Sequence, residues 1–268
     1  MALDYVIDHD CAPKQALTTA GILERLKARE RASTIIRLYR RSGDQRSPRE
    51  MGFEMLRTAA DGSEETQIVV VQHLLDSAAE LDPLATHCEG CPANRTGAPF
   101  GCMGRIDYPI SPNAEAFLLD RLPDPPTAPL VWLLLKQGIR DFSYDGGTVR
   151  PLRAEDRNIF VAEYALRRDL GELPVDSDQV FEMTFLTGHV RPNHAAILLL
   201  FFDALPREEL EAMQITELGA LPPDQRAAFD FLIPLRDSKD DDSTADLRAF
   251  LHALYLAWRL DVPLLLDV

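Results

Sequence analysis

Four cysteines are the residues of this chain whose types and spacing could do chemistry together. Cys88 and Cys91 form a C-x₂-C pair, Cys102 follows in the same loop, and Cys11 stands alone near the N-terminus. A C-x₂-C turn lets two sulfurs converge on one ion, and four thiolates complete a tetrahedral set. The sequence therefore predicts a metal or iron–sulfur site that ties the N-terminus to the loop at 88–102. Its role would be mainly structural, with a redox or sensing role left open.

Two kinds of metal site fit this spacing. Zinc sites usually take two C-x₂-C pairs, and this chain has one, whereas a [4Fe–4S] cluster readily takes three ligands from one loop and a fourth from a distant segment. Pro92 directly after Cys91 is similar to the Cys-Pro found at cluster ligands in bacterial ferredoxins. We therefore expect a [4Fe–4S] cluster, with Zn²⁺ as the alternative. His9 and His87 lie close to cysteines and could replace a thiolate or contact one.

The charge of the chain is unevenly distributed. Its net charge is −15, which argues against general binding to nucleic acid or to an anionic membrane surface. The segment from Lys14 to Arg57, however, contains eleven basic and five acidic residues, a net charge of +6. The remainder of the chain therefore contains 17 basic and 38 acidic residues, a net charge of −21. The interpretation we favour is that the two parts attract each other within one fold.

In a second interpretation, the basic segment 25–57 binds an anionic partner. In this alternative the protein is a zinc-stapled binding module that contacts an anionic partner, such as nucleic acid, through this segment. Arg37, Arg40 and Arg41, which we call the arginine triplet, are the candidate anion-binding residues. Few aromatic residues are interleaved with the arginines to stack on bases, so nucleic acid is not the favoured partner.

The elements that would position these residues follow from hydrophobic periodicity. Residues 14–31 have the spacing of an amphipathic helix that ends in a cationic run. Three β-rich runs follow at 33–41, 51–58 and 66–74, and Asp61-Gly62 before the last run is a hairpin signal. A small antiparallel sheet is therefore expected after the N-terminal helix.

The second half of the chain is predicted to be mostly helical. The segment 193–204 is apolar on every side, which indicates a helix buried at the centre of this part. Other helices are expected at 113–122, 127–138, 154–171, 176–188, 206–214, 222–232 and 243–260.

The expected fold class is thus α+β, with a small antiparallel sheet and N-terminal helix followed by a mainly α-helical part. The parts are residues 1–122, which include the cysteine loop, and 123–268, with the Pro-rich stretch at 122–129 as the candidate boundary. No stretch approaches the ~20 apolar residues of a spanning helix, and the N-terminus lacks a secretory signal, so we expect a cytoplasmic protein. No nucleotide-binding or serine-hydrolase motif is present, so the sequence does not identify a catalytic residue.

Overall fold

The computed structural model describes residues 2–58, 64–155, 158–208 and 210–267. The chain divides into two compact units, Asp10–Cys91, which we call the small unit, and Met1–His9 with Pro92–Val268, which we call the large unit. The α+β fold class is confirmed, with an N-terminal helix, antiparallel sheets and a mainly helical second half. The units are delimited differently from the expected parts 1–122 and 123–268, which stay a prediction.

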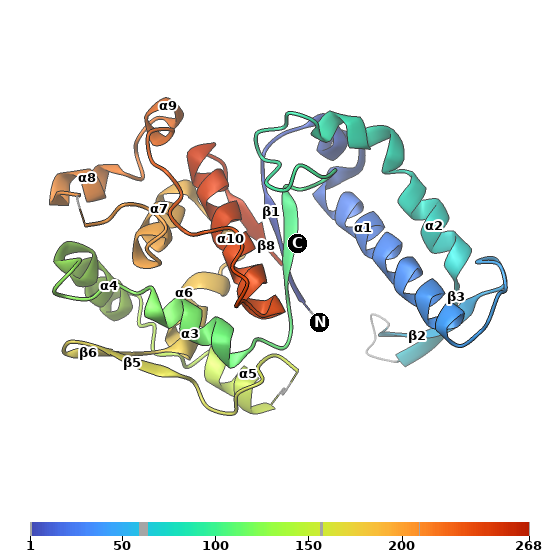
Figure 1. Ribbon diagram of the computed structural model, residues 1–268, viewed down its shortest axis with the longest axis horizontal. Coiled ribbons are helices and arrows are strands. Elements are labelled where there is room, and N and C mark those ends of the chain that lie inside the picture. The colour runs from blue at the N-terminus through green and yellow to red at the C-terminus, as the bar shows by residue number, and fades with distance from the viewer. Residues whose placement is uncertain (1, 59–63, 156–157, 209, 268) are drawn as a thin grey trace. The chain divides into compact units, whose positions relative to one another are not determined.

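The small unit is a long helix with a β-hairpin and a second helix. In chain order its elements are α1 (Ala12–Arg41), β2 (Gly52–Thr58), β3 (Glu64–Val70), α2 (Val71–Ala79) and the 3₁₀ helix η1 (Asp82–Cys88). Helices α1 and α2 lie side by side (Figure 1). Strands β2 and β3 pair antiparallel, which confirms the two later β-rich runs as partners, although residues 71–74 of the second run belong to α2. The expected Asp61-Gly62 turn lies outside the described residues.

The expected strand at 33–41 is wrong, because this segment forms the last turns of α1. Its apolar residues recur at the three- and four-residue spacing of one helix face. Two adjacent isoleucines favour a strand by propensity, but burial of an amphipathic face outweighs that preference. This face and the elements that cover it form the core of the small unit: Ala32, Ile35, Ile36, Tyr39, Met51, Phe53, Val71, Leu74 and Leu75.

A sheet formed from distant parts of the chain organises the large unit. Within the described residues its four strands are ordered β4 (Met103–Asp107), β1 (Ala2–Ile7), β8 (Leu264–Leu266) and β7 (His189–Val190). Strand β1 pairs antiparallel with both β4 and β8, so segments near the two ends of the chain are hydrogen-bonded neighbours. The sequence analysis did not identify β1 or β8, because each is short and its partner is far away in the chain.

Helices form most of the large unit, together with a two-stranded hairpin. The helices are α3 (Pro112–Asp120), α4 (Pro129–Asp141), α5 (Val149–Glu155), α6 (Ser177–Phe185), α7 (Pro192–Phe201), α8 (Ala212–Glu217), α9 (Pro223–Arg226) and α10 (Asp242–Arg259), and the hairpin is β5 (Arg167–Leu170) with β6 (Leu173–Asp176). The expected helix over 154–171 is wrong, since α5 ends at Glu155 and the strand β5 occupies Arg167–Leu170. Gly171 turns the hairpin at φ +65°, a region that glycine adopts without strain.

The core of the large unit surrounds α7 and α10. Helix α10 packs against α7, α3, β1 and β4, and its Trp258 is fully buried with Nε1–H donating to the Leu218 carbonyl at 3.3 Å. The buried position of α7 confirms the interpretation of the apolar run at 193–204. None of the helices in the described ranges combines the length and apolar character needed to cross a membrane.

Candidate functional site

The four cysteines predicted as ligands are divided between the two units. Cys11 is the N-cap residue of α1, Cys88 ends η1 and Cys91 follows it, whereas Cys102 belongs to the large unit. The tight turn forms as expected, with the Cys91 N–H donating to the Cys88 carbonyl at 3.4 Å. Among the described residues, however, no group of three or more His, Cys, Asp or Glu side chains is arranged to hold a metal ion. The predicted metal centre is therefore wrong, both as a [4Fe–4S] cluster and as a Zn²⁺ site.

The spacing of cysteines does not by itself specify a ligand set. Ligation requires every donor atom to lie about 2.0–2.3 Å from one point, which depends on where each Cα–Cβ bond points. Spacing places Cys88 and Cys91 in one turn but leaves the side chains of distant cysteines undetermined. His9 and His87 complete no ligand set in the part of the chain that the structure describes. The structural, redox and sensing roles and the zinc-stapled module depended on this centre, and they are wrong for the same reason.

The arginine triplet lies on one exposed face at the C-terminal end of α1. Arg37 donates to Thr34 Oγ1 at 3.2 Å, and Arg40 donates to the Asp44 carbonyl at 2.8 Å. Cations in the last turn of a helix also stabilise it against its own dipole. Anion binding by the triplet stays a prediction.

Other arginines of α1 pair with acidic residues of the same unit. Arg25 binds Glu80 at 2.6 Å, and Arg29 binds Asp82 at 2.7 Å. These two pairs join α1 to the segment that contains the end of α2 and the start of η1. Part of the basic segment is therefore neutralised locally by acidic side chains, in the way that the favoured interpretation of its charge expects.

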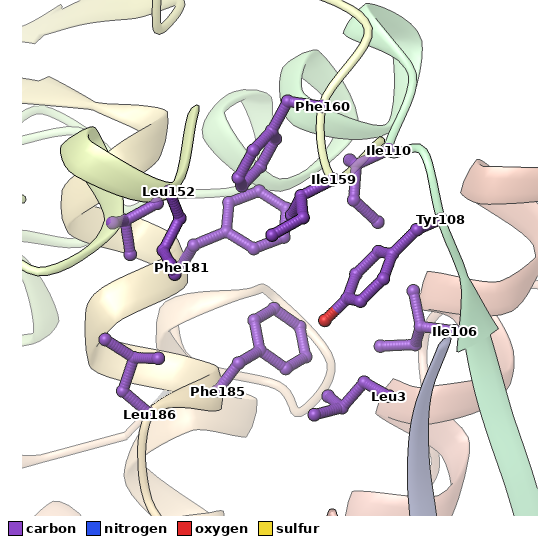
Figure 2. A pocket seen from close by; sticks show the side chains of 11 residues that line it. Leu3, Ile106, Tyr108, Ile110, Leu152, Ile159, Phe160, Phe181, Phe185 and Leu186 are labelled. Atoms are coloured by element: carbon purple, nitrogen blue, oxygen red, sulfur yellow. The ribbon is translucent and has the colours of Figure 1, made fainter. Parts of the chain in front are cut away.

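An apolar pocket in the large unit is the best-formed candidate site (Figure 2). Its cavity has a volume of about 50 Å³. Ten apolar side chains and one tyrosine line it: Leu3, Ile106, Tyr108, Ile110, Val149, Leu152, Ile159, Phe160, Phe181, Phe185 and Leu186. They come from β1, from β4 and the segment after it, from α5 and the segment after it, and from α6 with the residue that follows it. Leu152 and Leu186 are 40 % and 45 % exposed and form the rim.

Strand register and aromatic packing position the walls of this pocket. Leu3 is paired with Ile106 across β1 and β4, so their side chains share one face of the sheet. On the opposite wall, Phe181 packs edge-on against Phe160 and beside Phe185, with ring centroids 5.2 Å apart in both pairs. These contacts hold large side chains in place around a space that they do not fill.

Tyr108 supplies the polar atom of the pocket lining. Its hydroxyl points into the space between Ile159 and Phe185 (Figure 2). Burial raises the pKa of the Tyr108 phenol, and the negative charge of Asp267 raises it further. The phenol therefore stays protonated at neutral pH and can donate a hydrogen bond into the pocket.

A buried ionic network supports the α5 wall from behind. Arg153 of α5 donates to Asp178 at 2.8 Å and to both carboxylate oxygens of Glu115, at 3.1 and 2.7 Å. It also donates to the Ala162 carbonyl at 3.0 Å and to Ser177 at 3.4 Å, so all five of its N–H donors have partners. Burial opposes the positive charge, but the bonds to Glu115 and Asp178 outweigh it and raise the pKa of Arg153. This arginine is therefore a fixed support rather than a group available to a ligand.

The network reaches the pocket through Phe160, and a separate carboxylate holds the other end of α5. The Arg153 guanidinium lies over the Phe160 ring, 4.0 Å from its centroid, and Phe160 lines the pocket. At the other end of α5, the Glu182 carboxylate accepts from the Gly146 N–H at 2.7 Å and from the Thr148 N–H at 3.2 Å. A carboxylate at the N-terminus of a helix also stabilises the helix dipole. Both ends of α5 are thus anchored to residues of α6.

A second cavity of about 330 Å³ adjoins the first. Phe160 lines both cavities. The other lining residues of the second cavity are Arg153, Ala154, Val161, Ala162, Glu163 and Tyr164. Val161 and Tyr164 are largely exposed, so apolar surface continues past the first pocket onto the outside of the large unit.

This pocket was not predicted from the sequence. One signal was available, because Ile106, Tyr108 and Ile110 alternate and therefore point to one side of an extended segment. The opposite wall comes from α5 and α6, and no sequence pattern places those helices against β4. No known protein family, no characterised protein and no solved structure matches this chain. The cytoplasmic location expected from the sequence stays a prediction.

Proposed function

We propose that this protein binds a small apolar ligand in the pocket between β1, β4, α5 and α6. The observation that carries the proposal is a cavity of about 50 Å³ whose lining is apolar apart from one tyrosine and whose rim includes exposed leucines. Protein interiors are close-packed, with few voids larger than a water molecule. Binding sites for small molecules are typically apolar concavities with a few placed polar groups, as this one is.

The volume limits the part of a ligand that can enter. It exceeds the roughly 30 Å³ that a water molecule occupies in the liquid, and it is smaller than the roughly 150 Å³ cavity that accepts benzene. An apolar group of a few carbon atoms therefore fits, and the rest of a longer molecule would leave past Leu152 and Leu186.

A methyl-detected NMR titration of the full chain tests the proposal, with 2-pentanone as the probe. Saturable shifts are expected at Leu3, Ile106 and Ile110, which line the pocket. Leu152→Trp places a larger side chain at the rim. If it excludes two methylene groups of the probe, at about 0.8 kcal/mol each, the affinity should fall about tenfold.

Leu130→Trp is the matched control for this variant. Leu130 is 41 % exposed on α4, close to the 40 % of Leu152, and lines neither cavity. Its substitution should leave the affinity unchanged. The proposal is wrong if 2-pentanone produces no saturable shift at the pocket methyl groups, or if both tryptophan variants bind it as well as the wild type.

A further inference from the structure

The Tyr108 hydroxyl is a polar group without a partner in an apolar wall. It points into the pocket and makes no hydrogen bond to any residue that the structure describes (Figure 2). Two other tyrosines of the chain do find partners, since Tyr39 donates to the Gly52 carbonyl at 2.6 Å and Tyr255 donates to the Phe229 carbonyl at 2.7 Å. Tyr108 is half-buried, so water that enters the open pocket can accept from its hydroxyl until a ligand replaces that water. The direction of Tyr108 therefore leaves its O–H available to whatever occupies the pocket.

The surroundings of Tyr108 also restrict the charge of that occupant. The pocket is lined by apolar side chains and the tyrosine, so it offers no cation to a bound anion. The carboxylate of Asp267 is a negative charge that, in addition to burial, raises the pKa of the phenol. An anionic ligand would lose its hydration on entering an apolar pocket and would be repelled by this carboxylate.

We infer that the ligand is a neutral molecule that combines a short apolar part with one carbonyl or hydroxyl oxygen, and that Tyr108 selects it by donating a hydrogen bond to that oxygen. This inference rests on the proposed function and adds the chemical class of the ligand. Ketones, esters and alcohols belong to this class, whereas carboxylates and plain hydrocarbons do not. Tyr108 is then the residue that determines specificity, and the apolar walls supply affinity without selecting among functional groups.

The test compares three five-carbon probes, 2-pentanone, pentane and pentanoate, in the same NMR titration. Removing one hydrogen bond in Tyr108→Phe should weaken 2-pentanone about 2- to 10-fold and leave pentane unchanged. Pentanoate should bind the wild type at least about tenfold more weakly than 2-pentanone, because its charge has no partner in the pocket. Tyr164→Phe is the control, since Tyr164 is largely exposed and lies outside the first pocket.

The possible outcomes separate this inference from the proposal on which it rests. If none of the three probes shifts the pocket methyl groups, both are wrong. If pentane and 2-pentanone bind but respond equally to Tyr108→Phe, apolar binding stands and the inference is overturned. Pentanoate bound as tightly as 2-pentanone also overturns the inference. This last comparison uses wild-type protein, so it holds even if the Tyr108→Phe variant folds poorly.

Discussion

Replacing Arg153 with methionine should destabilise the large unit more than a typical surface substitution does. The side chains of Arg153, Glu115 and Asp178 are at most 2 % exposed. Methionine fills much of the arginine volume but leaves two carboxylates buried without their cation. Removing one partner from a buried ion pair costs about 3–5 kcal/mol, and the Ala162 carbonyl also loses a donor. We therefore expect a loss of about 4 kcal/mol in the free energy of unfolding.

Urea denaturation followed by tryptophan fluorescence measures this loss. Both tryptophans, Trp132 and Trp258, belong to the large unit, so the signal reports the unit that contains the substitution. With a denaturant slope of about 2 kcal/mol per molar urea, the midpoint should fall by about 2 M. Arg150→Met on the same helix is the control, because Arg150 is 59 % exposed and its nearest carboxylate is 3.9 Å away. Its effect should stay within about 0.5 kcal/mol.

A combined variant separates unpaired charge from lost packing. Replacing all three charged side chains together, as Glu115→Gln, Arg153→Met and Asp178→Asn, removes the buried charges and should recover part of the stability lost in Arg153→Met, because a neutral amide costs less to bury than an unpaired carboxylate. The reasoning is refuted if Arg153→Met costs no more than Arg150→Met. It is also refuted if the triple variant is less stable than Arg153→Met alone, because the loss would then not come from uncompensated carboxylates.

Three further predictions concern other parts of the chain. The Tyr5 hydroxyl is fully buried and has no hydrogen-bond partner among the described residues, so Tyr5→Phe should leave the melting temperature unchanged or raise it. Tyr255→Phe, which removes a hydrogen bond, should lower the melting temperature. A clear loss of stability in Tyr5→Phe would contradict this prediction. Burial and the charge of Arg95 lower the pKa of His252 to about 4, below its unfolded value of about 6.5. The contribution of neutral His252 to folding stability is therefore complete above pH 6.5 and is lost as the pH falls toward 4. His252→Gln should flatten the unfolding free energy over that pH range, and an unchanged slope would exclude this assignment. Replacing the arginine triplet with alanine should weaken any RNA binding and reduce its salt dependence, as measured by filter binding. The cost in stability, measured by thermal melting, should be less than about 1 kcal/mol per residue. RNA binding with unchanged affinity and salt dependence in the triple variant would exclude the triplet as the contact.

The elements were largely predictable from the sequence, where local periodicity specifies them. The helices around residues 112–120, 129–141, 177–185 and 242–259 were expected within a few residues of their observed limits. The errors came where propensity and periodicity disagreed, as in the isoleucine-rich end of α1, or where a strand was too short to show a pattern, as in β8. In both cases a partner distant in the sequence decided the conformation.

The sequence by itself determined the α+β class, the amphipathic faces and the buried α7, because each depends on residues close together in the chain. The tertiary structure alone decided which faces meet. It paired β1 with β8, set α5 and α6 against β4 to form the pocket, and brought Arg153 to Glu115 and Asp178. Over the described ranges it also forms no group of side chains able to hold a metal ion, because ligation depends on where donor atoms from distant segments meet and not on cysteine spacing. A local sequence pattern indicates which face a segment buries, whereas a site depends on which other elements pack against that face.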